Sequence, residues 1–206
     1  MKINFRIIFF LFFIFLFVLT FLFIKRNKKP IFYLEENLLV DTVNKIILFE
    51  GTIIKNRGEV KFLINPKGYE WLNEKVGILG NISLINLQNA LAFLNWALWE
   101  SLYIYKNLSR KISLFIITND KEIAAESLIV SKENQLTFLN LIFLGDPYWD
   151  NIVLKENYSN CQKCPLLEEE IKYFDKIFPQ RYFLNTKYFP IDKRVKIKLI
   201  LSDYNK

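Results

Sequence analysis

An unbroken apolar run near the N-terminus constrains this 206-residue chain more than any other feature. The run extends from Ile7 to Ile24, and Thr20 is its only polar residue. A helix rises about 1.5 Å per residue, so a helix over this run would be about 27 Å long, close to the hydrocarbon thickness of a bilayer. The sequence therefore predicts a single transmembrane helix at about residues 7–24, with the lipid bilayer as its partner.

Basic residues flank this run and account for most of the net charge. The chain has 28 basic and 21 acidic residues, and residues 1–29 hold six of the basic ones and no acidic one. Residues 30–206 are therefore almost neutral, with 22 basic residues against 21 acidic ones. Because the folded body has no basic surplus, we expect no nucleic-acid partner. We interpret the N-terminal basic residues as the charged flanks of a membrane segment.

A cleaved secretory signal is the alternative interpretation of the N-terminus. Such signals have a shorter apolar region and small residues at its exit. Here the exit is Phe23-Ile24-Lys25-Arg26-Asn27, without small residues or a cysteine. We therefore expect an uncleaved signal anchor in a single-pass membrane protein of the cell envelope. The flanking charges alone favour a cytoplasmic body, but a long domain after an N-terminal anchor is usually exported, so the body is expected to be extracytoplasmic.

Residues 30–144 are predicted to form an α+β domain, with a small mixed sheet packed on one long helix. The helix is expected from Leu84 to Tyr105, with Ser83 as its N-cap, because apolar residues recur there at helical spacing. Its five polar side chains argue against a second transmembrane helix. The expected strands are Ile31–Leu34, Lys45–Phe49, Gly51–Lys55, Glu59–Ile64 and Ile112–Thr118, with a hairpin loop at Asn56-Arg57-Gly58.

Residues 145–206 are predicted to be a C-terminal extension that contains a loop, a helix and a strand. The loop is polar and bears aromatic residues, and the helix is expected from about Pro165 to Phe178. In the final segment, Arg194–Leu201, apolar residues alternate with lysines. This alternation indicates a strand with one buried face and one solvent-exposed face, and we place its lysines on the exposed face.

The chain contains no histidine, which excludes Ser-His-Asp and Cys-His catalysis and imidazole zinc sites. The remaining chemical motif is Cys161-Gln162-Lys163-Cys164-Pro165, directly before the predicted helix. A thiol at a helix N-terminus has a lowered pKa, which suits disulfide exchange, although the acidic residues Glu168–Glu170 oppose that effect. A structural disulfide between Cys161 and Cys164 is the preferred interpretation, and free thiols are the other alternative. A zinc site would need additional ligands, so we expect no metal and no cofactor.

A weaker candidate site lies in the loop that opens the extension. Asp146 and Asp150 flank Tyr148 and Trp149 there. Paired carboxylates beside aromatic rings occur in sugar-binding and glycosidase sites. Loop aromatics serve packing more often than chemistry, so these four residues are kept as a candidate binding site without a catalytic role.

The order of elements over residues 49–122 resembles the GerMN domain family of sporulation and germination proteins. The similar parts are Phe49–Ile54 followed by Glu59–Asn65, the long helix Leu84–Tyr105, and Ile112–Thr118 with the turn Asn119-Asp120. The Gly-rich loop before the family's helix is reduced here to Gly77 and Gly80, and its threonine-rich helix face is absent. The resemblance implies a membrane-anchored or lipid-anchored, non-enzymatic assembly module, and no functional residues are carried over from it.

Together these observations predict a membrane-anchored extracytoplasmic binding or assembly module without catalytic activity. Its expected partner is another envelope protein. The alternative is an anchored thiol-disulfide oxidoreductase that uses Cys161 and Cys164.

Overall fold

A computed structural model of the chain describes residues 14–17, 32–35, 37–106, 112–119, 121–131, 136–147, 150, 168–190 and 193–202. The chain divides into two compact units, Met1–Ile31 and Phe32–Lys206. In the first unit, residues 14–17 are helical. The second unit contains every strand that the structure describes.

The predicted transmembrane helix is not supported. In the part of the chain that the structure describes, each helix is too short or too polar to cross a membrane. The longest described helix, α2 (Leu84–Leu94), is about 16 Å long, against the roughly 30 Å of a bilayer core. Residues 7–13 and 18–24 lie outside the described ranges. The predictions of a membrane-spanning signal anchor and of a single-pass membrane location are therefore corrected.

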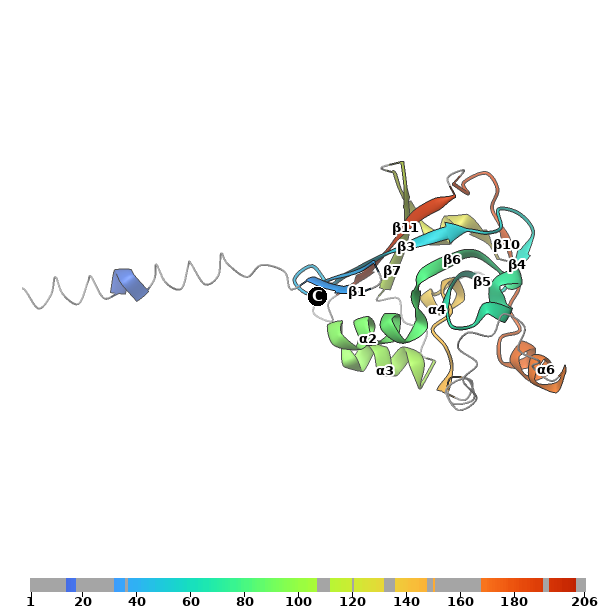
Figure 1. Cartoon of the computed structure of the whole chain (residues 1–206), viewed down its shortest axis with the longest axis horizontal. Helices are drawn as coiled ribbons and strands as arrows, with labels where there is room; N and C mark the ends of the chain where they lie inside the picture. The colour runs from blue at the N-terminus through green and yellow to red at the C-terminus, as the bar shows by residue number, and fades with distance from the viewer. Residues whose placement is uncertain are drawn as a thin grey trace, which may run out of the picture. The chain divides into compact units, whose positions relative to one another are not determined.

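The second unit is built on an eight-stranded mixed sheet, which confirms the α+β class (Figure 1). The order along the sheet is β1-β2-β3-β11-β7-β8, and β6 pairs with both β3 and β5. Only β5 and β6 are parallel to each other among these pairs, and the other described pairs are antiparallel. The strands are β1 (Phe32–Glu35), β2 (Leu38–Asp41), β3 (Ile46–Ile53), β5 (Phe62–Lys67), β6 (Val76–Ser83), β7 (Ile112–Thr118), β8 (Lys121–Ala124) and β11 (Arg194–Leu201).

The C-terminal strand β11 lies in the middle of this sheet. It pairs along its length with β3 on one side and β7 on the other. Its alternation is as predicted: Val195, Ile197, Leu199 and Leu201 are buried, and the residues between them face outward. Residues 145–206, which sequence analysis treated as an extension, thus contribute a central strand to the main sheet.

The helix predicted at 84–105 is broken into α2 (Leu84–Leu94) and α3 (Trp96–Tyr103). Ser83 caps α2 as predicted, because its hydroxyl accepts a hydrogen bond from the Asn86 backbone N–H at 3.2 Å. The break is at Asn95, whose backbone is extended (φ −160°, ψ 96°) and whose side chain accepts from the Leu98 N–H at 3.0 Å. An asparagine carbonyl that caps a new helix competes with continuation of the previous one.

Both helices pack their apolar residues into the main core, below the sheet in Figure 1. This core also receives the short helix α4 (Phe138–Leu141) and the 3₁₀ turn η2 (Ala125–Leu128). The buried residues of α2 are spaced three and four apart, as expected for a helix with one buried face. They are Leu84, Leu87, Ala90, Leu91 and Leu94.

The hairpin predicted around Asn56-Arg57-Gly58 is not formed. The strand after it, β4 (Glu59–Val60), pairs with β10 (Tyr182–Leu184), which also pairs with β9 (Ile129–Val130). One edge of β3 is occupied by β11, and the other is shared by β2 and β6. No edge of β3 is therefore left for the following strand, and β4 joins a separate three-stranded sheet.

A second, aromatic cluster holds helix α6 (Glu168–Ile177) against the body. Phe174 of α6 is fully buried and contacts Trp71 and Phe143 ring to ring. Lys61 adds polar contacts: its Nζ lies 2.8 Å from Asp175 Oδ1 and donates to the Phe178 carbonyl at 2.7 Å. Lys61 thus binds a side chain of α6 and the backbone at its C-terminal end, where a cation is favourable.

Gly51 sets the spacing between β3 and its neighbours. A Cβ at this position would lie 2.7 Å from Ile197 Cδ1, 3.0 Å from Ile78 Cγ2 and 3.3 Å from the Leu79 carbonyl oxygen. We expect Gly51→Val to reduce the free energy of unfolding by about 1–3 kcal/mol, because the side chain overpacks the core. The matched variant Ser113→Val, at an outward position of β7, should change it by less than about 0.5 kcal/mol in urea denaturation. Equal losses in the two variants would contradict this account.

Asp175 makes part of the stability depend on pH. Burial acts to raise the pKa of its carboxyl, but the hydrogen bond and charge of Lys61, with Lys75, outweigh it and hold the pKa below its usual value. The stabilisation is therefore complete above the ordinary pKa of 3.8 and is lost as the pH falls below it.

We expect the thermal midpoint of the wild type to fall more steeply between about pH 4 and pH 2 than that of Asp175→Asn. The control is Glu126→Gln, which removes an exposed carboxylate from η2. This control should retain the wild-type pH dependence of the thermal midpoint. If the thermal midpoint of Asp175→Asn depends on pH as steeply as that of the wild type, the role of this ion pair is refuted.

Candidate functional site

The outward face of β11 carries a line of basic side chains. The strand register places Lys196 between Glu50 of β3 and Ile117 of β7. Further along, Lys198 pairs with Glu122 of β8 at 3.0 Å. This face therefore combines charges of both signs with half-buried apolar residues.

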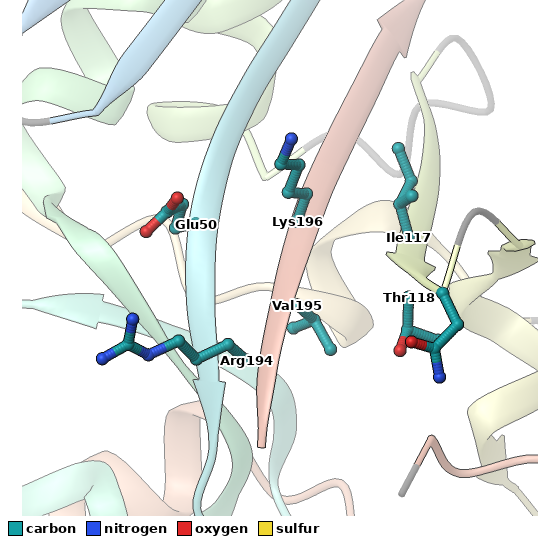
Figure 2. Close-up of a pocket in the computed structure, with 7 residues that line it drawn as sticks. Glu50, Ile117, Thr118, Arg194, Val195 and Lys196 are labelled. Carbon is teal, nitrogen blue, oxygen red and sulfur yellow. The ribbon is translucent and has the colours of Figure 1, made fainter. Parts of the chain in front are cut away.

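A pocket of about 230 Å³ opens on this face where β7 ends. Figure 2 shows Arg194 and Lys196 on β11, beside Glu50 of β3, with Ile117 and Thr118 of β7 on the other side. Asn119 has a left-handed backbone (φ 44°) because it begins the tight turn from Thr118 to Lys121 of β8. The pocket is lined by Glu50, Ile117, Thr118, Asn119, Arg194, Val195 and Lys196.

The charged groups around this pocket form no ion pair with one another in the part of the chain that the structure describes. Among the described residues, neither Arg194 nor Lys196 has a carboxylate within ion-pair distance, and Glu50 has no cation. Guanidinium and ammonium groups on one wall can hold an anionic group. The sequence predicted the solvent-exposed face of β11 but not the pocket. Glu50 and Asn119 are distant in sequence and reach the pocket only because their strands lie beside β11 in the sheet.

The predicted loop site is partly described. Asp150 accepts hydrogen bonds from the hydroxyls of Tyr69 and Tyr103, the latter at 2.5 Å, and from the Gln88 side-chain amide at 3.0 Å. The Asp146 backbone N–H lies 3.4 Å from the same carboxylate. Tyr148 and Trp149 lie outside the described residues.

Asp146 has a different partner, Lys106. The two side chains lie 3.3 Å apart, and Lys106 also donates to the Gly145 carbonyl at 3.1 Å. Gly145 adopts φ +83°, and a Cβ there would lie 2.7 Å from an Asp150 carboxylate oxygen. Only glycine therefore fits at this position beside Asp150.

The environment of Asp150 affects both tyrosines. Burial raises the pKa of the Tyr69 hydroxyl, and the charge of Asp150 raises it further. Burial is also the main reason that the pKa of Tyr103 is raised, followed by its hydrogen bond to Asp150. Both phenols therefore stay protonated well beyond the usual tyrosine range and remain hydrogen-bond donors.

This cluster joins separate segments through one carboxylate. Tyr103 belongs to α3, Gln88 to α2, and Tyr69 directly precedes the 3₁₀ segment η1 (Glu70–Lys75). With donors on both oxygens, Asp150 acts as an anchor for the loop. Sequence reasoning found Asp146 and Asp150 but missed their partners. The available signal was Gln88, one of the polar residues of a largely apolar helix.

The helix pair α2–α3 also presents an apolar surface, which we call the helix-pair face. Three of its aromatic residues are largely exposed: Phe93 and Trp96 at 62% each, and Tyr105 at 72%. Trp99 contacts Trp96 at 4.9 Å and stacks on Tyr103 at 5.2 Å between ring centroids. Large exposed apolar side chains that gather on one element indicate an interaction surface. The helix-pair face consists of the exposed residues Ile85, Phe93, Trp96, Ile104 and Tyr105, together with the half-buried Trp99 and Tyr103.

The predicted disulfide is not supported. The residues that the structure describes contain no pair of cysteines that could form one, and Cys161 and Cys164 themselves lie outside the described ranges. Within those ranges, no three carboxylate, cysteine or histidine side chains gather in a way that could hold a metal ion.

Comparisons with protein-family models, with curated proteins and with solved structures give no match for this chain. The resemblance to the GerMN family therefore remains a prediction.

Removal of the Tyr103 hydroxyl tests whether its hydrogen bond to Asp150 stabilises the fold. We expect Tyr103→Phe to lower the free energy of unfolding by about 1.5–3 kcal/mol, because it removes a hydrogen bond to a part-buried carboxylate. Tyr105→Phe removes the same atom from an exposed ring two residues away and should cost less than about 0.5 kcal/mol. Urea denaturation of both variants measures the difference. Equal effects would show that Asp150 does not depend on Tyr103.

Proposed function

We propose that this protein is a non-catalytic assembly module that pairs with a second copy of itself through the helix-pair face. The observation that carries the proposal is the group of exposed aromatic residues on α2–α3, led by Phe93 and Trp96. Aromatic residues are enriched in the buried centres of protein interfaces, where they provide much of the binding energy.

The charge of this face favours a second copy as the occupant. Residues 84–105 contain a single charged residue, Glu100. A twofold interface places the same patch of both subunits together, so charges on it tend to meet charges of the same sign. A nearly uncharged apolar face avoids that repulsion, and homodimer interfaces are more apolar than transient ones.

Two further points support a role without catalysis. The chain has no histidine, and the carboxylate of Asp150 is already occupied by donors from Tyr69, Tyr103 and Gln88. The resemblance of residues 49–122 to the GerMN family, whose members are regarded as non-enzymatic assembly modules, is in keeping with this proposal.

Sedimentation velocity of the purified full chain over a range of concentrations tests self-association. We expect a concentration-dependent dimer, and we expect Phe93→Gln with Trp96→Gln to raise its dissociation constant at least about tenfold, as for residues at the centre of an interface. Hydrogen exchange at high protein concentration should show added protection in α2 and α3.

The control is Phe183→Gln, which removes an aromatic ring that is 50% exposed on β10, outside the helix-pair face. It should leave the dissociation constant unchanged. A chain that stays monomeric at every concentration would overturn the proposal. The proposal would also be overturned if Phe183→Gln raised the dissociation constant as much as the double variant did, or if the double variant left it unchanged.

A further inference from the structure

The pocket at the end of β7 is a second candidate binding site, on a different element from the helix-pair face. Arg194, Lys196 and Glu50 approach it from adjacent strands, and none has an oppositely charged partner within ion-pair distance in the described part of the chain. Lys198, the next outward residue of β11, does have such a partner in Glu122, as do Lys61 and Lys106 elsewhere on the body. Three unpaired charges around one hollow indicate a place for a charged ligand.

The two basic side chains are exposed and extend in different directions from β11 (Figure 2), so rotation about their side-chain bonds would bring both onto one anionic group. Arg194 and Lys196 are two residues apart on β11, so both side chains stand on the same outward face. A guanidinium binds a carboxylate through two parallel hydrogen bonds, and an ammonium adds a third donor. Asn119 provides an amide on the opposite wall.

The surroundings of the pocket indicate a ligand that is partly apolar. Ile117 lines the pocket, and Phe115 and Leu48 lie next along the same face, each half-buried. A free inorganic anion would leave these side chains uncovered. A peptide segment with an apolar residue beside an acidic one would contact both.

The charge pattern argues against a nucleic acid. Glu50 and Glu122 stand among the basic residues of this face, and residues 30–206 carry 22 basic against 21 acidic residues. A phosphate backbone needs a continuous basic track to release its counterions. A single carboxylate held by two cations, with Glu50 at the edge, suits a discrete acidic side chain.

We propose that the pocket formed by β3, β7 and β11 binds an acidic, partly apolar segment of a partner protein, whose carboxylate is held by Arg194 and Lys196. The site does not depend on the helix-pair face, so it can be tested whether or not the chain dimerises.

The probe is a labelled, terminally blocked peptide of alternating glutamate and leucine, followed by fluorescence anisotropy with the full chain. We expect binding that weakens with salt, and at least about tenfold weaker binding of the matched glutamine–leucine peptide, since a charged hydrogen-bonded pair contributes more than 1.4 kcal/mol. Arg194→Gln and Lys196→Gln should each weaken the glutamate peptide by about fivefold to tenfold.

The control variant is Lys176→Gln, which makes the same charge change at an exposed position on α6. It should bind like the wild type, and circular dichroism should show all variants folded. The proposal would be overturned if the two peptides bound equally well, or if Lys176→Gln lowered the affinity for the glutamate peptide as much as Arg194→Gln or Lys196→Gln did. Competition by inorganic phosphate at the peptide's own affinity would identify a small-anion site and overturn the assignment to a protein segment.

Discussion

The insertion of β11 between β3 and β7 is the constraint on which the rest of the structure depends. Its four inward side chains complete the inner face of the sheet, and its outward side chains build the pocket wall. The strand that closes the sheet is synthesised after both of its neighbours, because it follows them in the sequence. Until it arrives, β3 and β7 have unpaired edges, and pairing across most of the chain length is slow and prone to wrong partners.

The two faces of the sheet therefore carry different properties. The inner face packs on α2, α3 and α4 and is apolar. The outer face keeps Arg194, Lys196 and Glu50 in solvent beside half-buried apolar residues. The helix pair then presents its own outer side, so the body has an aromatic surface and a charged pocket on separate elements. This separation fits a module that makes two kinds of contact.

Local patterns predicted the parts of this fold that depend on neighbouring residues. The alternation in Arg194–Leu201, the strand Ile112–Thr118 and the Ser83 cap are all found. The failures have long-range causes: the turn at Asn56-Arg57-Gly58 makes no hairpin because other strands already occupy β3. Periodicity alone could not show that Asn95 would leave the helix to cap the next one. In the loop, Asp146 and Asp150 were identifiable as polar residues, but Tyr69 and Tyr103 are 81 and 47 residues from Asp150.

The double role of Tyr103 has a consequence for association. Its ring stacks on Trp99 in the helix-pair face, and its hydroxyl is held by Asp150 behind that face. An aromatic side chain restrained on both sides has little rotational freedom to lose when a partner covers it. Ordering a mobile side chain at an interface costs about 0.5–1.5 kcal/mol, and this surface avoids much of that cost because it is preorganised. The part-buried carboxylate of Asp150 thus helps to preorganise this surface from behind it.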